Sequence, residues 1–258
     1  MQIKKLFIAL GIVLPLHMQG QNFLIKEAPE VIESYVNQFN REDNELYKQD
    51  IPNCGASDFL RKNIPFFECP DKELEKTYYF RWWTYRKHIK KTPDGFVITE
   101  FLPDVPWAGK YNTISCAANH HFYEGRWLRN AEILSDYASF WFSGSGNPRL
   151  YSFGAADAIY NYYLIHNDKM LLADLYPKLK DNFAKWEEEK RDSTGMFWQV
   201  DDRDGMEMSV SGHLSEGGRG YRPTINSYMY GEAVALAKIA SIVDRDMEAR
   251  TYQKKADK

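Results

Sequence analysis

Residues 153–190, FGAADAIYNYYLIHNDKMLLADLYPKLKDNFAKWEEEK, decide the fold of this chain. Apolar residues recur at helical spacing over 153–165 and again over 168–190. Only His166-Asn167-Asp168 separates the two runs. Because a connection this short joins antiparallel neighbours, the stretch predicts a tight helical hairpin.

The same pattern continues on both sides of this hairpin. Two further short turns are predicted, at Leu128-Arg129-Asn130 and at Asp244-Arg245-Asp246. One strand is predicted, over 96–101, where β-branched and aromatic residues gather. Further helices are predicted over 29–47, 71–91, 112–127, 130–142, 224–243 and from 245 to the end of the chain. The sequence therefore predicts an all-α fold built of helical hairpins.

Long connections alternate strictly with the short turns. They cover residues 92–111, 143–152 and 191–223. In antiparallel helices this alternation places every short turn at one end of the fold and every long connection at the other. Since binding and catalytic residues concentrate on loops held by a rigid scaffold, we expect the functional site at the end with the long connections.

Composition narrows the classes of function. The chain has 258 residues, of which 44% are hydrophobic and 27% charged, so it can bury a full core and is not a disordered chain. A formal net charge of -3 argues against a nucleic-acid binder. The sequence has no CxxC pair and no His/Cys cluster at zinc spacing, so no metal site is predicted.

The N-terminus has the pattern of an export signal. Two lysines precede an apolar run over 6–16, and a small residue, Gly20, offers a cleavage point. We expect a signal peptide over 1–20, an N-terminal extension over 21–70, and a periplasmic or secreted protein. The alternative is a buried N-terminal helix. No other run is long enough to span a membrane, so no span is expected in the mature chain.

The three cysteines have different expected roles. In an oxidising compartment a disulfide between Cys54 and Cys69 is feasible. Cys116 lies in an apolar helical stretch and is expected to be a buried thiol.

The long connections are rich in residues that suit a sugar ligand. Aromatic rings stack on the apolar face of a sugar, while carboxylates and guanidinium groups bind its hydroxyls. A solvated charged loop is the alternative interpretation, but it leaves the tryptophans of these connections unexplained. The residues that suit a sugar include Glu100, Asp104, Trp107, Tyr111, Arg149, Tyr151, Trp198, Asp201, Asp204, Glu207, Tyr221 and Arg222.

Five segments resemble the six-hairpin glycosidases. They are YYFRWWTYRKHIK (78–90), VITEFLPDVPW (97–107), HFYEGRWLR (121–129), DDRDGMEMS (201–209) and YRPTINSYMY (221–230). More narrowly they resemble the mannosylglycerate-hydrolase-like glycoside hydrolase domain, which is related to trehalases and to family 63 glucosidases. The resemblance runs from residue 71 to 258 and implies an (α/α)6 toroid. It also implies hydrolysis of an α-linked glycoside with no cofactor.

The resemblance also implies roles for individual residues. Family members are typically inverting enzymes, in which one carboxylic acid protonates the leaving oxygen and a second carboxylate activates water. Glu207 falls on the acid position, where relatives carry Asp, and Asp204 is the second candidate. Residues expected to line the sugar subsite are Trp107, Tyr111, Arg149, Tyr151, Tyr221, Arg222 and Asn226.

The general base of the family usually lies far downstream of the acid. We therefore expect it beyond Lys258, and we expect the present chain to be the front part of a longer toroid. On that basis the isolated fragment should be inactive and poorly stable.

Two other functions stay open from the sequence. A polysaccharide lyase on a related toroid would use His121, Tyr221 and Arg222 to abstract a proton beside a uronate carboxylate. A carbohydrate-binding toroid would keep the aromatic residues without a working acid and base.

Overall fold

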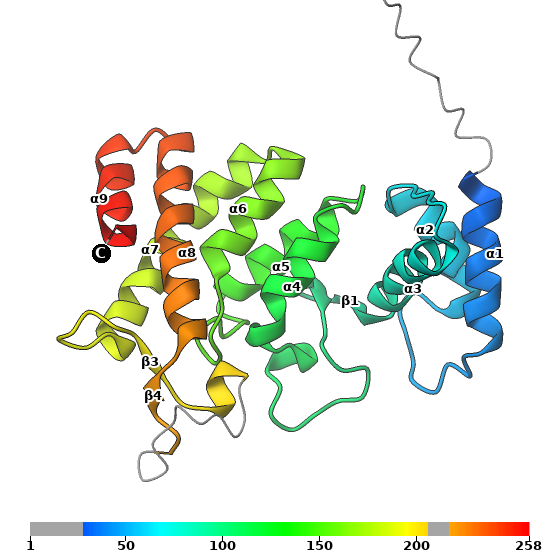
Figure 1. Ribbon diagram of the computed structural model, residues 1–258, viewed down its shortest axis with the longest axis horizontal. Helices are drawn as coiled ribbons and strands as arrows, with labels where there is room; N and C mark the ends of the chain where they lie inside the picture. Colours follow the sequence, from blue (N-terminus) through cyan, green and yellow to red (C-terminus); the bar gives the residue numbers. More distant parts are fainter. Residues whose placement is uncertain (1–27, 206–216, 258) are drawn as a thin grey trace, which may run out of the picture.

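The computed structural model describes residues 28–205 and 217–257. Nine α-helices make up most of this part of the chain (Figure 1). They are α1 (Ala28–Arg41), α2 (Ala56–Asn63), α3 (Lys72–His88), α4 (Ser115–Gly125), α5 (Glu132–Phe142), α6 (Ala155–His166), α7 (Lys169–Lys190), α8 (Pro223–Ile242) and α9 (Asp246–Ala256). The prediction of an all-α fold is confirmed.

Short strands and single helical turns occupy the connections. Strands β1 (Ile89–Thr92) and β2 (Gly95–Ile98) form an antiparallel hairpin after α3, and β3 (Trp198–Gln199) pairs with β4 (Gly220–Tyr221). The 3-10 turns are η1 (Asn53–Gly55), η2 (Lys110–Asn112) and η3 (Asp202–Asp204).

The tight turn between α6 and α7 follows from its sequence. Asn167 adopts a left-handed conformation with φ of 52°, which ends α6. Asp168 then accepts the backbone N–H of Leu171 at 2.9 Å and so caps the start of α7. The predicted helical hairpin over 153–190 is confirmed.

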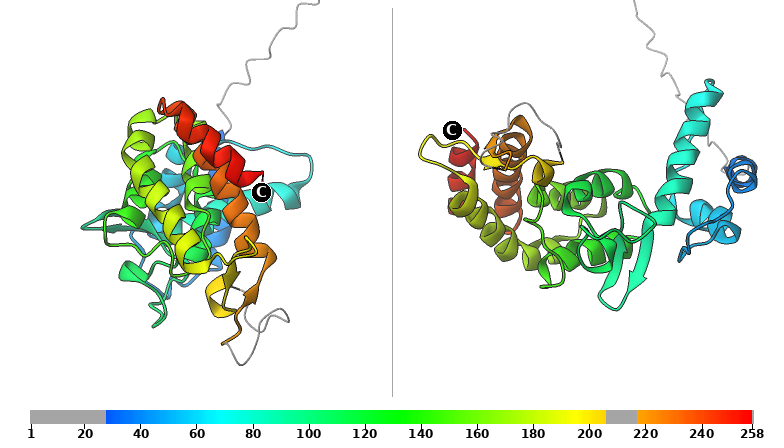
Figure 2. Two further views of the ribbon diagram at one scale, coloured as in Figure 1. Left: turned by 90° about the vertical axis from the view of Figure 1, so that its left-hand side faces the viewer. Right: turned by 90° about the horizontal axis from the view of Figure 1, so that it is seen from below.

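The repeated hairpins form two layers of helices. In one layer α4 packs against α6 and α6 packs against α8, while α5 contacts α7 behind them. Figure 2 shows these helices following one another along an arc. The arrangement is that of an incomplete α/α toroid, with α4, α6 and α8 as neighbouring helices of one layer.

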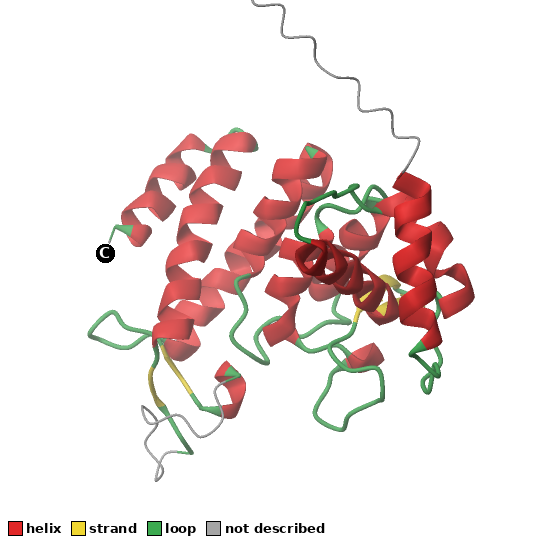
Figure 3. Ribbon diagram, turned by 45° about the vertical axis from the view of Figure 1, so that its right-hand side comes forward, coloured by secondary structure: helices red, strands yellow, loops and turns green. Residues whose placement is uncertain are grey.

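The connections divide between two ends of this arc. Figure 3 shows the α6–α7 and α8–α9 turns at the upper end, and the connections over 99–111, 191–205 and 217–222 at the lower end. The long connections lead into the N-termini of α4, α6 and α8. The alternation in the sequence therefore places these three N-termini at the end expected to hold the functional site.

The N-terminal helices α1 and α2 pack against α3. Arg86 of α3 is fully buried and donates to Gln49 Oε1 at 2.8 Å, which holds the segment after α1 against α3. Some predicted bounds were wrong in this region. The first helix ends at Arg41, α2 was not predicted, and α3 ends at His88 because β1 begins there and pairs with the predicted strand.

Two further findings concern the cysteines and the membrane. Cys54 and Cys69 are not joined by a disulfide, so the pairing considered above is absent, and Cys116 is half-buried rather than buried. None of the helices within 28–205 and 217–257 is long and apolar enough to cross a membrane.

Candidate functional site

Asp204 occupies the last position of η3, where the long connections meet. Its side chain is buried and accepts a hydrogen bond from the Ser152 hydroxyl. The Ser152 backbone N–H also donates to Arg203 O at 2.8 Å, so the second and third long connections are joined here. Burial raises the pKa of the Asp204 carboxyl above its usual value, against the opposing effect of the Ser152 hydroxyl.

Glu207, the predicted acid, lies outside the described residues. The last described residue before it, Gly205, has a φ of 65°, a left-handed conformation that favours glycine. A Cβ added to Gly205 would lie 4.0 Å from Cβ of Cys116, the second residue of α4. The chain therefore leads into the segment that contains Glu207 from beside the N-terminus of α4.

Arg222, near the end of the third connection, is buried. It forms an ion pair with Asp201, and its Nε donates to Gln199 O at 3.2 Å. Its guanidinium also donates to Gly218 O. Arg222 thus holds the strands β3 and β4 and the residues beside them in one place, and its contact with a sugar stays a prediction.

Asn226 fastens the third connection to α8. Its Oδ1 accepts the backbone N–H of Phe197 at 2.9 Å, and its Nδ2 donates to Phe197 O and Arg222 O, both at 2.8 Å. The side-chain amide therefore joins α8 to the residue before β3. Its predicted role toward a sugar stays a prediction.

Tyr221 and Trp198 face each other across the β3–β4 pair. Tyr221 is half exposed, and its hydroxyl donates to Asp192. Trp198 lies between two cations, with Lys190 Nζ at 3.9 Å and the Arg219 guanidinium at 4.0 Å from its ring. The aromatic residues of this connection are thus partly engaged by charged neighbours.

The predicted residues of the second connection lie on opposite sides of it. Arg149 forms an ion pair with Glu189 of α7 at 3.2 Å. Tyr151 is buried, with the Arg203 guanidinium 5.1 Å from its ring, and its backbone N–H donates to Ser115 Oγ at 3.1 Å. Tyr151 therefore belongs to the junction around Asp204, whereas Arg149 points toward α7.

Trp107 and Tyr111 lie on the first long connection. Trp107 is 52% exposed and packs edge-on against Phe101, with ring centroids 6.0 Å apart. Tyr111 has a φ of 59° and packs against Phe140 of α5. Trp107 is the predicted residue that presents the most open aromatic surface to a ligand.

A cavity of about 160 Å³ opens between the middle and C-terminal part of α4 and the N-terminal halves of α6 and α8. Within it the Tyr123 hydroxyl donates to Asp157, and Asn161 Nδ2 donates to Asp157 Oδ1 at 3.2 Å. Burial raises the pKa of Asp157. The residues that line the cavity are Asn119, His120, Tyr123, Gly154, Asp157, Ser227, Tyr228 and Gly231.

This polar cluster was not predicted from the sequence. Asp157 and Asn161 stand four residues apart, which places them on one face of α6, and this spacing is the one local signal. Tyr123 comes from another helix, and only the packing of α4 against α6 brings it to Asp157.

Glu232 of α8 contacts Asp157, one of the residues that line this cavity. Its side chain is completely buried, and its Oε1 accepts the backbone N–H of Asp157 at 3.0 Å. Burial raises the pKa of the Glu232 carboxyl to about 8.

The residues of the lyase hypothesis occupy three different environments. His121 Nδ1 contacts the Tyr137 hydroxyl at 3.1 Å, and burial lowers the pKa of its imidazole to about 3. The Tyr221 hydroxyl contacts Asp192, whereas Arg222 is paired with Asp201. The geometry therefore does not favour a lyase centre built on this set.

Within residues 28–205 and 217–257, no three His, Cys, Asp or Glu side chains form a group that could hold a metal ion.

Comparison with known proteins agrees with the fold and with the resemblance noted in the sequence. Residues 110–258 match the family model of the mannosylglycerate hydrolase MGH1-like glycoside hydrolase domain. The match covers more than half of the chain, which therefore belongs to this family of glycoside hydrolase domains.

A solved structure titled "Sialidase" is also similar to this chain. The two are 40% identical with a TM-score of 0.83, over 89% of this chain and 21% of that chain. The chain thus spans about a fifth of the length of that structure. A search of curated protein sequences found no match to the present chain.

Proposed function

We propose that the chain acts as a glycoside hydrolase domain that cleaves an α-linked glycoside with inversion of configuration. The observation that carries the proposal is the junction at Ser152, where the hydroxyl and backbone N–H tie two long connections together beside the buried Asp204 carboxyl. This junction lies beside the N-termini of α4 and α6. Both helices fall within residues 110–258, which match a glycoside hydrolase family. The family implies a carbohydrate substrate.

In this proposal Glu207 is the general acid. A general acid must hold its proton near neutral pH, which requires an environment that raises the pKa of its carboxyl. The raised pKa of Asp204, three residues earlier, supports such an environment at this junction. Asp204 is the alternative acid, and the Ser152 and Tyr151 side chains belong to its surroundings.

The inverting mechanism requires a second carboxylate as general base. It would face the acid across about 6.5–9.5 Å, which leaves room for the attacking water. Trp107 supplies an exposed aromatic face that suits stacking on the apolar side of a sugar ring.

The test is a digestion of a glycan panel by the full-length protein, with product anomers read by NMR. The panel includes α-glucosides, α-mannosides and α-sialosides. An α-linked substrate should release a β-anomer first. An α-anomer as first product would contradict inversion, and no release from any α-linked member would contradict the proposal.

Three variants separate the two candidate acids. Glu207→Gln should lower turnover by at least ~10²-fold, the usual size of a general-acid contribution. A glycosyl fluoride, whose leaving group needs little protonation, should restore much of the lost rate. Asp202→Asn, an exposed neighbour on η3, is the matched control. If Asp204→Asn shows the loss and the fluoride rescue instead of Glu207→Gln, Asp204 is the acid.

Export is a second part of the proposal. The charged and apolar pattern of residues 1–20 supports a cleaved signal peptide. N-terminal sequencing of the protein recovered from its native host should begin at Gln21. A cytoplasmic protein that retains residues 1–20 would contradict export.

A further inference from the structure

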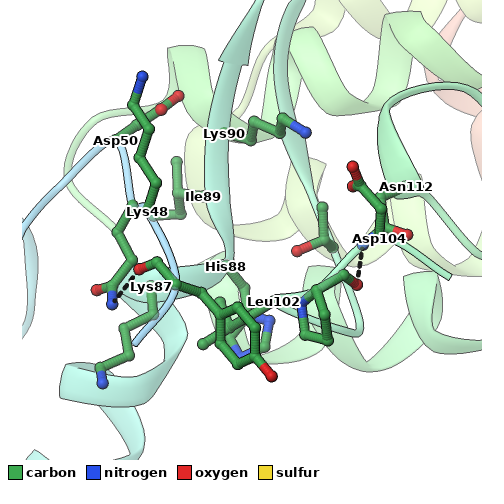
Figure 4. Close-up of a pocket in the computed structure, with 13 residues that line it drawn as sticks. Lys48, Asp50, Lys87, His88, Ile89, Lys90, Leu102, Asp104 and Asn112 are labelled. Carbon is green, nitrogen blue, oxygen red and sulfur yellow. Dashed lines mark hydrogen bonds between the residues drawn. The ribbon is translucent and has the colours of Figure 1, made fainter. Parts of the chain in front are cut away.

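A second cavity lies between the N-terminal helices and the first long connection, and Figure 4 shows its lining side chains. Its volume is about 390 Å³, within the range of about 300–1,000 Å³ that is usual for small-molecule sites. Its walls come from residues 47–50, 87–90 and 102–104, together with Thr99 and Asn112. It shares no lining residue with the cavity between α4, α6 and α8.

Three lysines line this cavity, together with the carboxylates of Asp50 and Asp104, and two of these lysines form no ion pair in the described residues. Lys87 forms an ion pair with Asp43 at 2.8 Å. Lys48 and Lys90 form no ion pair within the described part of the chain. Lys90 is half-buried, so its ammonium group has lost part of its hydration without gaining a carboxylate. An anionic group of a ligand would compensate the Lys90 ammonium group.

The cavity also offers an acceptor for hydroxyl groups. Nδ1 of His88 is buried and has no hydrogen-bond partner within the described residues. Burial lowers the pKa of His88, so the ring adds no positive charge to this wall near pH 7, and its buried Nδ1 is out of a ligand's reach. Asp104 supplies the acceptor, a carboxylate that is exposed and forms no ion pair in the described residues.

An apolar surface completes the lining. The Tyr47 ring is 41% exposed, and Leu102 and Pro103 lie on the wall formed by the first long connection. Aromatic and aliphatic surface of this kind contacts the C–H face of a sugar ring. A small inorganic anion would use the lysines but would leave this surface without a function.

We propose that this cavity binds an acidic sugar, that is, a pyranose that carries a carboxylate. Lys90 holds the carboxylate, Asp104 accepts hydroxyl hydrogens, and Tyr47 contacts the ring. The site goes beyond the proposed hydrolase centre and does not depend on it.

The experiment is isothermal titration of the full-length protein with D-glucuronate and with D-glucose. Glucuronate should bind at least ~10-fold more tightly than glucose, the size expected of a charge-assisted contact. Its affinity should fall when the ionic strength rises from ~0.05 M to ~0.5 M, because the contact is partly exposed.

Two adjacent lysines on β1 give a matched pair of variants. Lys90→Gln should weaken glucuronate binding by at least ~10-fold and leave glucose binding unchanged. Lys91 is the neighbouring residue on the strand and lies 5.4 Å from the Phe96 ring, outside the cavity. Lys91→Gln should therefore bind glucuronate like the wild type.

The proposal is overturned if glucose binds as tightly as glucuronate, if neither binds, or if the Lys90 and Lys91 variants behave alike. Glu207→Gln separates the two sites. This variant should still bind glucuronate whether or not it loses hydrolysis. The acidic-sugar site is therefore tested separately from the hydrolase assignment. Loss of glucuronate binding in Glu207→Gln would place the ligand at the proposed hydrolase centre and overturn the second site.

Discussion

Glu232 of α8 accepts the backbone N–H of Asp157, in the first turn of α6, at 3.0 Å. Helix α6 begins after Gly154, which has no side chain to cap it. The first N–H groups of a helix lack partners within the helix, and a buried N–H without a partner is costly. A residue of the following hairpin therefore completes the start of α6.

Removing this acceptor should destabilise the fold. Glu232→Ala should lower the free energy of unfolding by about 1–3 kcal/mol, because it leaves a buried N–H unpaired and a space in the core. Glu188→Ala, an exposed glutamate of α7, is the control and should change it by less than about 0.5 kcal/mol. Urea unfolding followed by circular dichroism measures both, and equal effects would remove the capping role.

Glu232 should also give stability a pH dependence. Its pKa is raised from 4.5 to about 8 in the folded state, so the folded protein keeps a proton that the unfolded chain releases. Its contribution is therefore complete below pH ~4.5 and is lost as the pH rises through about 8. Glu232→Gln cannot titrate. The free energy of unfolding of the wild type should fall relative to this variant between pH ~5 and pH ~8. A difference that stays constant with pH would contradict the assignment.

The Asn226 amide should control how firmly the third connection is held. Asn226→Ala removes its three hydrogen bonds and should lower the free energy of unfolding by about 1–3 kcal/mol. Limited proteolysis should cut faster within residues 191–200, because these residues lose their attachment to α8. The neighbouring Ser227→Ala changes an exposed side chain and should behave like the wild type. Identical digestion of the two variants would show that the amide is dispensable.

Two helical glycines should respond oppositely to alanine. A Cβ at Gly125 would lie 2.0 Å from the Tyr85 hydroxyl, which itself donates to His121 O at 2.7 Å. Gly125→Ala should therefore destabilise the protein by about 1–3 kcal/mol or more. A Cβ at Gly231 would have no described atom within 4 Å, so Gly231→Ala should stabilise α8 by about 0.5–1 kcal/mol. Thermal unfolding compares the pair. A Gly125→Ala variant as stable as the wild type would contradict this packing.

The hairpin fold could be predicted because its signals are local. Asp168 caps α7 and Asn167 ends α6 within one short turn, and both residue types are readable from the sequence. The end of α3 was harder to predict from the sequence, since residues 89–92 form a strand only by pairing with residues 95–98. Helix α2 is eight residues long, too short for a clear periodic pattern.

The candidate site could be predicted from the sequence only in part. Asp204 stood out because acidic and aromatic residues gather in the third connection. Its side-chain hydrogen-bond donor is Ser152, which lies 52 residues away in the sequence. Asp157 and Glu232 gave no comparable signal, because each looks like an ordinary polar residue of a helix until the neighbouring helices pack around it.

The bond between Glu232 and Asp157 also bears on how the protein is made. The acceptor lies 75 residues after the donor. A ribosome releases the chain from its N-terminus, so α6 emerges long before the side chain that satisfies its first turn. During synthesis the first turn of α6 stays incomplete until α8 has been made. A stalled nascent chain that stops before Glu232 should therefore expose α6 to chaperones and proteases.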